Sequence, residues 1–307
     1  MSPSPADTRS DTPPLDEHGI RKLTHLTKLM VWGDRQPVTR TPADLGLAFE
    51  EVAFQATDGV PLRGWFIPSG LERGPAVVFV HGWLWNRAGN AAGRVPFVDR
   101  DVDFLPPTKA LHDAGYSVLL FDLSNHGASG KRPPLTMGRW EARDFNGALG
   151  YLRGRPDVDP DRIGALGTSA GANTVMYAIP DGPPVKAFLA VQPTRLPVFN
   201  RNFSRDELGP LGPMAAKSTD LLYVFLRAPL PSRHNPADVA PKLGDTVVQY
   251  VQGTGDPWGR MSIVEEFSDL TPHSLGVIHF PSAGRYEGYQ YVSKQADDVA
   301  AFFTAHL

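Results

Sequence analysis

The chain has 307 residues, a formal net charge of −3 and 41% hydrophobic residues, which is enough apolar content for one large domain. The small net charge gives no reason to expect nucleic acid or an anionic membrane as a partner, and the oligomeric state stays open. The absence of cysteine excludes disulfides, thiolate metal sites and cysteine nucleophiles. Residues 1–15 are polar and proline-rich and carry no secretory signal, so we predict a disordered tail and a cytoplasmic protein.

Residues 16–307 alternate between helical and strand patterns and are predicted to form a single domain. Apolar spacing indicates a leading amphipathic helix over residues 18–32. Strands are then predicted at residues 49–56, 62–67, 76–80, 117–122, 162–166, 185–191, 246–251 and 275–280, with helices at 104–114, 136–152, 170–179 and 288–307. Continuous apolar strands separated by helices predict the α/β class, with a doubly wound, mostly parallel β-sheet flanked by helices.

Two long segments interrupt this alternation, at residues 84–103 and at about 193–244. The second is rich in proline, arginine and aromatic residues. Long insertions in a compact domain are usually functional, so we predict a helical lid over the strand ends, with a solvated excursion as the alternative.

The pentapeptide Gly167-Thr168-Ser169-Ala170-Gly171 has the pattern G-x-S-x-G. This pattern holds a serine on a tight turn between a strand and a helix, with its hydroxyl exposed. An apolar strand is predicted before the turn, and a helix that ends at Pro180 is predicted after it. The context therefore predicts a nucleophile elbow with Ser169 at its tip.

Further motifs follow the predicted strands in a recognisable order. The stretch His81-Gly82-Trp83 follows one apolar strand, Asp122–Ser129 reads D-x-x-x-H-G-x-S after another, and Asp256 follows a later strand within Gly253–Pro257. With the elbow, these motifs resemble the α/β-hydrolase superfamily of serine hydrolases and esterases, from about residue 49 to residue 307. The resemblance implies the α/β-hydrolase fold with a lid insertion.

The resemblance also implies roles for individual residues. Ser169 is expected to be the nucleophile and Asp256 the acid that orients a general base. The backbone N–H groups of Ala170 and Trp83 are expected to form the oxyanion hole. His81 is expected to be a substrate-binding residue that also holds the loop of Trp83, rather than a catalytic one.

The general base is the point at which this sequence departs from the family. Members of the family carry a histidine just past the last strand, and the matching position here is Arg285. Arginine keeps its proton and offers no acceptor, so it cannot take a proton from serine. We name His279, within the last predicted strand, as the candidate base, with His126 and Glu287 as alternatives.

Three functions remain open at this point. The first is a hydrolase that uses a displaced base to cleave a carboxylic ester, lactone or thioester. The second is a relative with a degenerate triad that catalyses elimination or cyclisation, and the third is a small-molecule binding protein. We predict the hydrolase, without metal or cofactor and acting on an apolar or aromatic acyl compound, because Trp258 and Tyr286 fall on segments predicted to line the pocket. Arg285 offers a cation for a substrate carboxylate.

Overall fold

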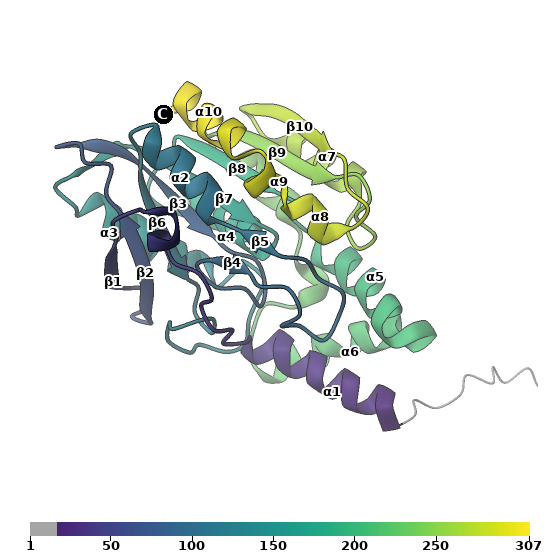
Figure 1. The fold of residues 1–307 in the computed structure, drawn as a ribbon. Helices are drawn as coiled ribbons and strands as arrows, with labels where there is room; N and C mark the ends of the chain where they lie inside the picture. Colours follow the sequence, from purple (N-terminus) through teal and green to yellow (C-terminus); the bar gives the residue numbers. More distant parts are fainter. Residues whose placement is uncertain (1–16) are drawn as a thin grey trace, which may run out of the picture.

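The computed structural model describes residues 17–307, so the tail predicted at residues 1–15 lies outside the described residues. An eight-stranded sheet forms the centre, in the order β1-β2-β6-β3-β7-β8-β9-β10 (Figure 1). Its strands are β1 (Glu50–Gln55), β2 (Pro61–Ile67), β3 (Gly74–Val80), β6 (Ser117–Asp122), β7 (Val158–Thr168), β8 (Ala187–Val191), β9 (Val247–Gly253) and β10 (Ser274–Phe280). The pairs β1–β2 and β2–β6 are antiparallel, and the other neighbours are parallel. The predicted α/β fold with a mostly parallel sheet is therefore confirmed.

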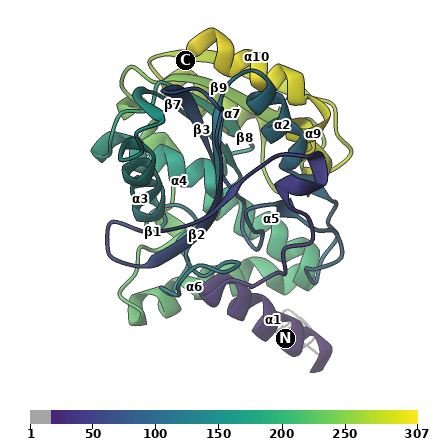
Figure 2. The same cartoon turned by 60° about the vertical axis from the view of Figure 1, so that its left-hand side comes forward.

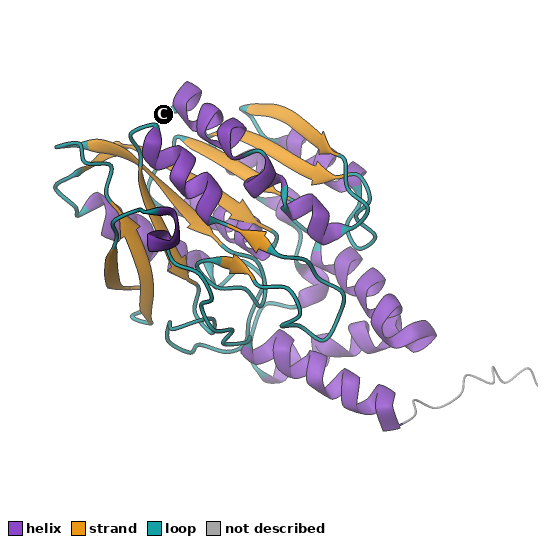
Figure 3. Cartoon of the chain, in the orientation of Figure 1, coloured by secondary structure: helices purple, strands orange, loops and turns teal. Residues whose placement is uncertain are grey.

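Helices cover both faces of this sheet (Figure 3). One face carries α2 (Leu105–Asp113), α8 (Arg285–Tyr289), α9 (Tyr291–Lys294) and α10 (Ala296–His306), and the other carries α3 (Ala142–Arg153), α4 (Ala170–Ala178) and α7 (Met261–Leu270). Every residue of β3, β6 and β8 is buried. A strand covered on both faces needs apolar side chains in both directions, which explains the continuous apolar runs in the sequence.

Two predicted helices differ from the structure in extent. The helix predicted from residue 136 begins only at Ala142, because Met137 and Gly138 have positive φ angles of 53° and 127°. The carboxylate of Glu141 accepts hydrogen bonds from the N–H groups of Thr136 and Gly138 at 2.9 and 2.8 Å, which holds this turn outside the helix. The predicted final helix is divided into α8, α9 and α10.

Three further helices lie together at one end of the molecule, beside the carboxyl edge of the parallel strands (Figure 2). They are α1 (Glu17–Trp32), α5 (Leu196–Leu208) and α6 (Gly212–Phe225). The insertion predicted at about 193–244 supplies α5 and α6 between β8 and β9, so its helical character is confirmed, whereas its action as a lid stays a prediction.

The earlier insertion, residues 84–103, is irregular apart from a short ribbon of β4 (Gly89–Asn90) and β5 (Val102–Asp103). Short 3₁₀ turns occur at residues 42–45, 179–181, 209–211, 231–233, 236–238 and 240–242. Within residues 17–307, no helix has the length and apolar composition that crossing a membrane requires.

Candidate active site

Ser169 lies at the junction of β7 and α4, on the turn that the G-x-S-x-G pattern predicts. Its φ and ψ angles are 52° and −118°, a strained conformation for a residue with a side chain. The Ser169 N–H donates to the carbonyl of Val191 at 2.9 Å, which ties the turn to β8. A Cβ atom on Gly171 would lie 2.1 Å from the carbonyl oxygen of Val80, so only glycine fits beside this serine. The side chain of Ser169 remains partly exposed.

The two residues predicted to supply the oxyanion hole share a hollow with Ser169. Trp83 and Ala170 line one hollow with the serine, together with part of α5. Within residues 17–307, neither peptide N–H has a hydrogen-bond acceptor. Both groups are therefore available to an oxygen of a bound ligand.

Arg285 occupies the space between Asp256 and Ser169. Its Nη1 forms an ion pair with Oδ2 of Asp256, and its Nη2 donates to Ser169 Oγ at 3.4 Å and to Thr194 Oγ1 at 2.5 Å. The residue is 4% exposed. Burial opposes its charge, but the interactions with Asp256 and Tyr289 together outweigh burial and raise the pKa of Arg285 above its ordinary value. The arrangement is thus acid–arginine–serine, with a permanent cation beside the serine oxygen.

Asp256 is held rigidly by four donors. Its Oδ1 accepts the N–H groups of Trp258 and Gly259, both at 3.0 Å. Its Oδ2 accepts Gln252 Nε2 at 3.1 Å as well as the guanidinium of Arg285. With both oxygens satisfied, this buried carboxylate orients Arg285 and has no lone pair directed at Ser169.

Tyr289 is a site residue that the sequence analysis missed. It is 2% exposed and lines the pocket that contains Ser169. Burial raises its pKa to about 12, while the charge of Arg285 and hydrogen-bonding interactions with Ser169 and Arg285 act in the opposite direction. The guanidinium carbon of Arg285 lies 5.2 Å from the centre of the tyrosine ring. The sequence did carry a signal for Tyr289, because it follows Arg285 by four positions on α8. Residues four apart on a helix share one face.

The pocket in front of Ser169 is aromatic. It is lined by Trp83, Trp85, Phe97, Ser169, Phe199, Trp258, Arg285, Tyr286 and Tyr289. The structure therefore brings Trp83, Trp258 and Tyr286 to the pocket with Ser169. The free space is 20 Å³, roughly that of one water molecule. Entry of an acyl compound consequently requires some of these side chains to move.

The structure does not bring His279 to Ser169. His279 lies on the edge strand β10, half exposed, with its Nε2 at 3.3 Å from Glu265 Oε1 on α7. Three strand spacings separate β10 from β7, roughly 14 Å. The alternative base Glu287 is also directed elsewhere, because its carboxylate pairs with Arg100 at 3.1 Å. Neither group is within hydrogen-bond reach of the serine.

His81 and His126 are fully engaged in holding loops. The Nε2 of His81 accepts the N–H of Leu123 at 3.0 Å, and the Nε2 of His126 accepts the N–H of Leu84 at 3.2 Å. Burial lowers the pKa of His81, and it lowers the pKa of His126 to about 4. Both rings are therefore neutral. Neither of them lines the aromatic pocket, so the structure does not bring His81, predicted to bind substrate, to a ligand there. His81 instead contacts the backbone of Gly82 and Leu123.

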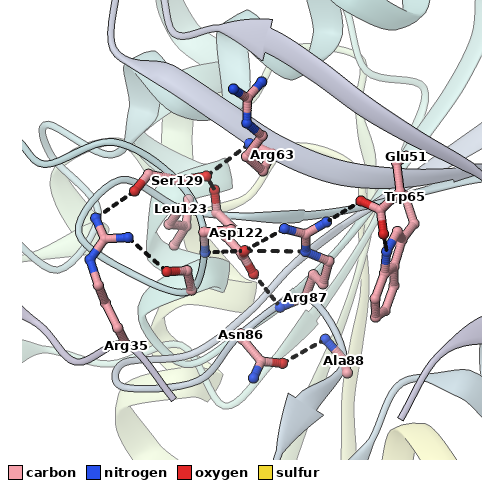
Figure 4. Close-up of polar contacts among 12 residues, drawn as sticks. Arg35, Glu51, Arg63, Trp65, Asn86, Arg87, Ala88, Asp122, Leu123 and Ser129 are labelled. Carbon is pink, nitrogen blue, oxygen red and sulfur yellow. Dashed lines mark hydrogen bonds and ion pairs between the residues drawn. The ribbon is translucent and has the colours of Figure 1, made fainter. Parts of the chain in front are cut away.

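A second buried ion pair fixes the loop that follows Trp83 (Figure 4). Asp122, at the end of β6, accepts Arg87 Nη2 at 2.9 Å and the backbone N–H groups of Arg87 and Ala128 at 2.7 and 2.8 Å. Burial opposes ionisation of Asp122, but Arg87 overrides it and lowers the pKa of the carboxyl. Arg87 also reaches Glu51 at 3.3 Å and lies over the ring of Trp65. These contacts fasten the loop to β1, β2 and β6.

A model of the alpha/beta hydrolase family matches residues 77–301. This span is most of the chain and contains Ser169, Asp256 and Arg285. The chain therefore belongs to the alpha/beta hydrolase family. The solved esterase Pf2001 of Pyrococcus furiosus is similar in fold, with a TM-score of 0.66 and 22% identity over 89% of this chain and 98% of the esterase.

Two curated relatives are similar over a shorter stretch. The uncharacterized protein YfhR of Salmonella typhi is 33% identical over 143 residues, which are 45% of this chain and 42% of YfhR. The alpha/beta hydrolase domain-containing protein WAV2 of Arabidopsis thaliana is 32% identical over 151 residues, 49% of this chain and 43% of WAV2. The chain thus matches less than half the length of these relatives.

Proposed function

We propose that this chain is a serine hydrolase that cleaves a carboxylic ester, lactone or thioester with an apolar or aromatic acyl group. The observation that carries the proposal is the setting of Ser169. It lies on a strained elbow, partly exposed in an aromatic pocket, beside two peptide N–H groups without acceptors among the described residues. Similarity in fold to an esterase supports the same class of reaction.

The residues of the site have distinct parts in this reaction. Ser169 Oγ attacks the acyl carbonyl, and the N–H groups of Ala170 and Trp83 stabilise the negative charge that forms on the carbonyl oxygen. Such a donor contributes about 3 kcal/mol to lowering the barrier. The guanidinium of Arg285 stabilises negative charge on Oγ as its proton leaves, but it does not accept that proton. Asp256 keeps the guanidinium in place.

The acyl group is expected to bind against the aromatic rings. Phe199 stacks on Phe203 with ring centres 5.4 Å apart, and Trp258 lies edge-on to Phe199 at 5.8 Å. Such a surface favours flat or apolar groups through burial and ring contacts. We therefore expect aryl and arylalkyl esters to be cleaved faster than short, polar ones.

The test is covalent labelling with a fluorophosphonate, followed by mapping of the adduct by mass spectrometry. We expect the adduct on Ser169, and Ser169→Ala should abolish it and lower ester turnover at least about 100-fold. Ser218→Ala, at an exposed position on α6, is the control and should behave like the wild type. Labelling at another residue, or turnover that survives in Ser169→Ala, would overturn the proposal.

One observation favours a second candidate, the binding of a free carboxylic acid. The cation of Arg285 lies beside the hydroxyl of Ser169 in the pocket, and together with the unpartnered N–H groups it would suit a carboxylate. Calorimetry with aromatic carboxylates separates the two functions. Tight binding of the acids by a protein that neither cleaves esters nor reacts with fluorophosphonate would establish binding in place of hydrolysis.

A further inference from the structure

We propose that Tyr289 is a catalytic residue that passes a proton between Ser169 and the leaving group of the substrate. The inference rests on the proposed hydrolase function and concerns the step that this function leaves without a base.

The surroundings of Ser169 hold few groups that can take its proton. Arg285 only donates. The oxygens of Asp256 are occupied by four donors, and the hydroxyl of Thr194 already accepts from Arg285 at 2.5 Å. Among the side chains of residues 17–307 that line the aromatic pocket, Tyr289 and Tyr286 carry the other hydroxyl groups. Of these two, Tyr289 is the one whose ring faces the guanidinium of Arg285, at 5.2 Å, and that guanidinium donates to Ser169 Oγ.

The packing around Tyr289 fixes this hydroxyl in position. Its ring is edge-on to Trp85, with ring centres 5.0 Å apart, and edge-on to Tyr286 at 5.7 Å. The guanidinium of Arg285 faces the same ring at 5.2 Å. A cation at this distance stabilises negative charge that develops on the phenol oxygen. Tyr289 is therefore rigid, neutral at physiological pH and able both to accept and to donate a proton.

In the acylation step the proton of Ser169 is transferred through Tyr289, so no separate base is needed. Ser169 Oγ forms a bond to the acyl carbon, and the bond from that carbon to the leaving oxygen breaks. The serine proton moves to Tyr289 Oη while the phenol proton moves from Oη to the leaving oxygen, which departs as an alcohol. In deacylation a water oxygen forms a bond to the acyl carbon, and the bond from that carbon to Ser169 Oγ breaks. The water gives one proton to Tyr289 Oη, the phenol proton returns to Ser169 Oγ, and the carboxylic acid leaves. Tyr289 is neutral before and after each step.

This relay makes a prediction that depends on the leaving group. Ethoxide needs a proton as it leaves, whereas p-nitrophenolate is a stable anion and departs without one. Tyr289→Phe should therefore lower kcat/KM for the ethyl ester of phenylacetic acid at least about 100-fold. The loss for the p-nitrophenyl ester of the same acid should be at least about ten times smaller.

Tyr291→Phe is the matched control. Burial raises the pKa of Tyr291 to about 12 as well, and the residue is buried near α8, but its ring packs on Phe280. The control should keep both rates within about twofold of the wild type. Thermal unfolding of both variants verifies that each is folded.

The outcomes separate the two proposals. A loss in Tyr289→Phe that is larger for the ethyl ester supports the relay. Equal losses for both esters in a folded variant, or no loss, would overturn the role of Tyr289 while hydrolysis by Ser169 still stands. If the wild type neither cleaves these esters nor reacts with fluorophosphonate, the hydrolase function itself fails.

Discussion

Two buried arginine–aspartate pairs lie in this fold, and they differ in what surrounds them. Arg87 and Asp122 have side-chain exposures of 4% and 0%, and Arg285 and Asp256 have exposures of 3% and 1%. Each aspartate also accepts backbone N–H groups. In composition and burial the two pairs are almost the same.

The difference is access to a reactive atom and to open space. Asp122 and Arg87 are enclosed by loops and by β2, with Glu51 and Trp65 as further neighbours (Figure 4). Arg285 lines the aromatic pocket and donates to the hydroxyl of Ser169. Burial and ion pairing alone therefore do not distinguish a pair within a loop from a pair at the candidate active site, because both kinds of site perturb ionisation in the same way.

The largest effect is expected from Arg285→His. An imidazole between Asp256 and Ser169 can accept the serine proton, which the guanidinium cannot. We expect ester hydrolysis to rise about 10²- to 10⁴-fold, with a rate that increases through a pKa near 6.5. The measurement is turnover of p-nitrophenyl esters between about pH 5 and 9.

Arg285→Lys is the control, because it keeps a cation at this position and supplies no base at neutral pH. A gain in the histidine variant that Asp256→Asn then removes would establish that the acid is correctly placed. A folded histidine variant without any gain would show that the pocket is not organised for ester chemistry.

Substitution in the pair of Arg87 and Asp122 should change the stability of the fold. Arg87→Met leaves the charge of Asp122 buried without its partner, and the free energy of unfolding should fall by about 3–5 kcal/mol. Chemical denaturation measures this loss. Labelling of Ser169 by fluorophosphonate, scaled to the folded fraction, should stay near the wild-type level.

Arg100→Met is the matched control for this variant. Arg100 pairs with Glu287, and their side chains are 56% and 28% exposed to solvent. The free energy of unfolding should therefore fall by less than about 1 kcal/mol in this variant. A loss of that small size in Arg87→Met as well would mean that the pair at Asp122 does not secure the loop.

Asp144 differs from Asp122 in its partners. It is buried beside Ser124, and no arginine forms an ion pair with it among the described residues. Its Oδ2 accepts the N–H of Ser124 at 2.8 Å, and burial raises its pKa to about 7. The unfolded chain releases this proton near pH 4, so between pH 4 and 7 the folded state binds more protons and stability falls as the pH rises. The wild type should lose about 3 kcal/mol between pH 5 and 8 from this group.

Asp144→Asn should remove that decrease, because an amide stays neutral across this range. Denaturation curves at pH 5 and pH 8 for both proteins test the idea. Parallel pH dependence in the two proteins would show that Asp144 is ionised in the folded state.

The smallest effect is expected from His279→Ala. The side chain is half exposed and pairs with Glu265, and the structure does not bring it to Ser169. We expect ester turnover within about twofold and stability within about 0.5 kcal/mol of the wild type. A loss of turnover beyond about tenfold would restore His279 as a base and imply a rearranged β10.

The sequence by itself determined the layers of the fold and the position of the strained turn at Ser169. Buried parallel strands need apolar residues on both faces, and the elbow needs small residues at fixed spacing. Local sequence patterns therefore predict both the strands and the elbow. It also placed Asp256 after its strand and Arg285 after the last one. The beginning of α3 escaped prediction because the side chain of Glu141 binds a turn upstream of the helix.

Only the tertiary structure decided how the groups around Ser169 are combined. It placed Arg285 between Asp256 and the serine, brought Tyr289 into the same pocket against the guanidinium of Arg285, and left His279 on a distant edge strand. Arg285 lies 29 positions from Asp256 and 116 positions from Ser169 in the chain, so their meeting depends on sheet order and on the packing of α8. Local periodicity carries no information about such distances, because it reports only which face of its own element a residue occupies.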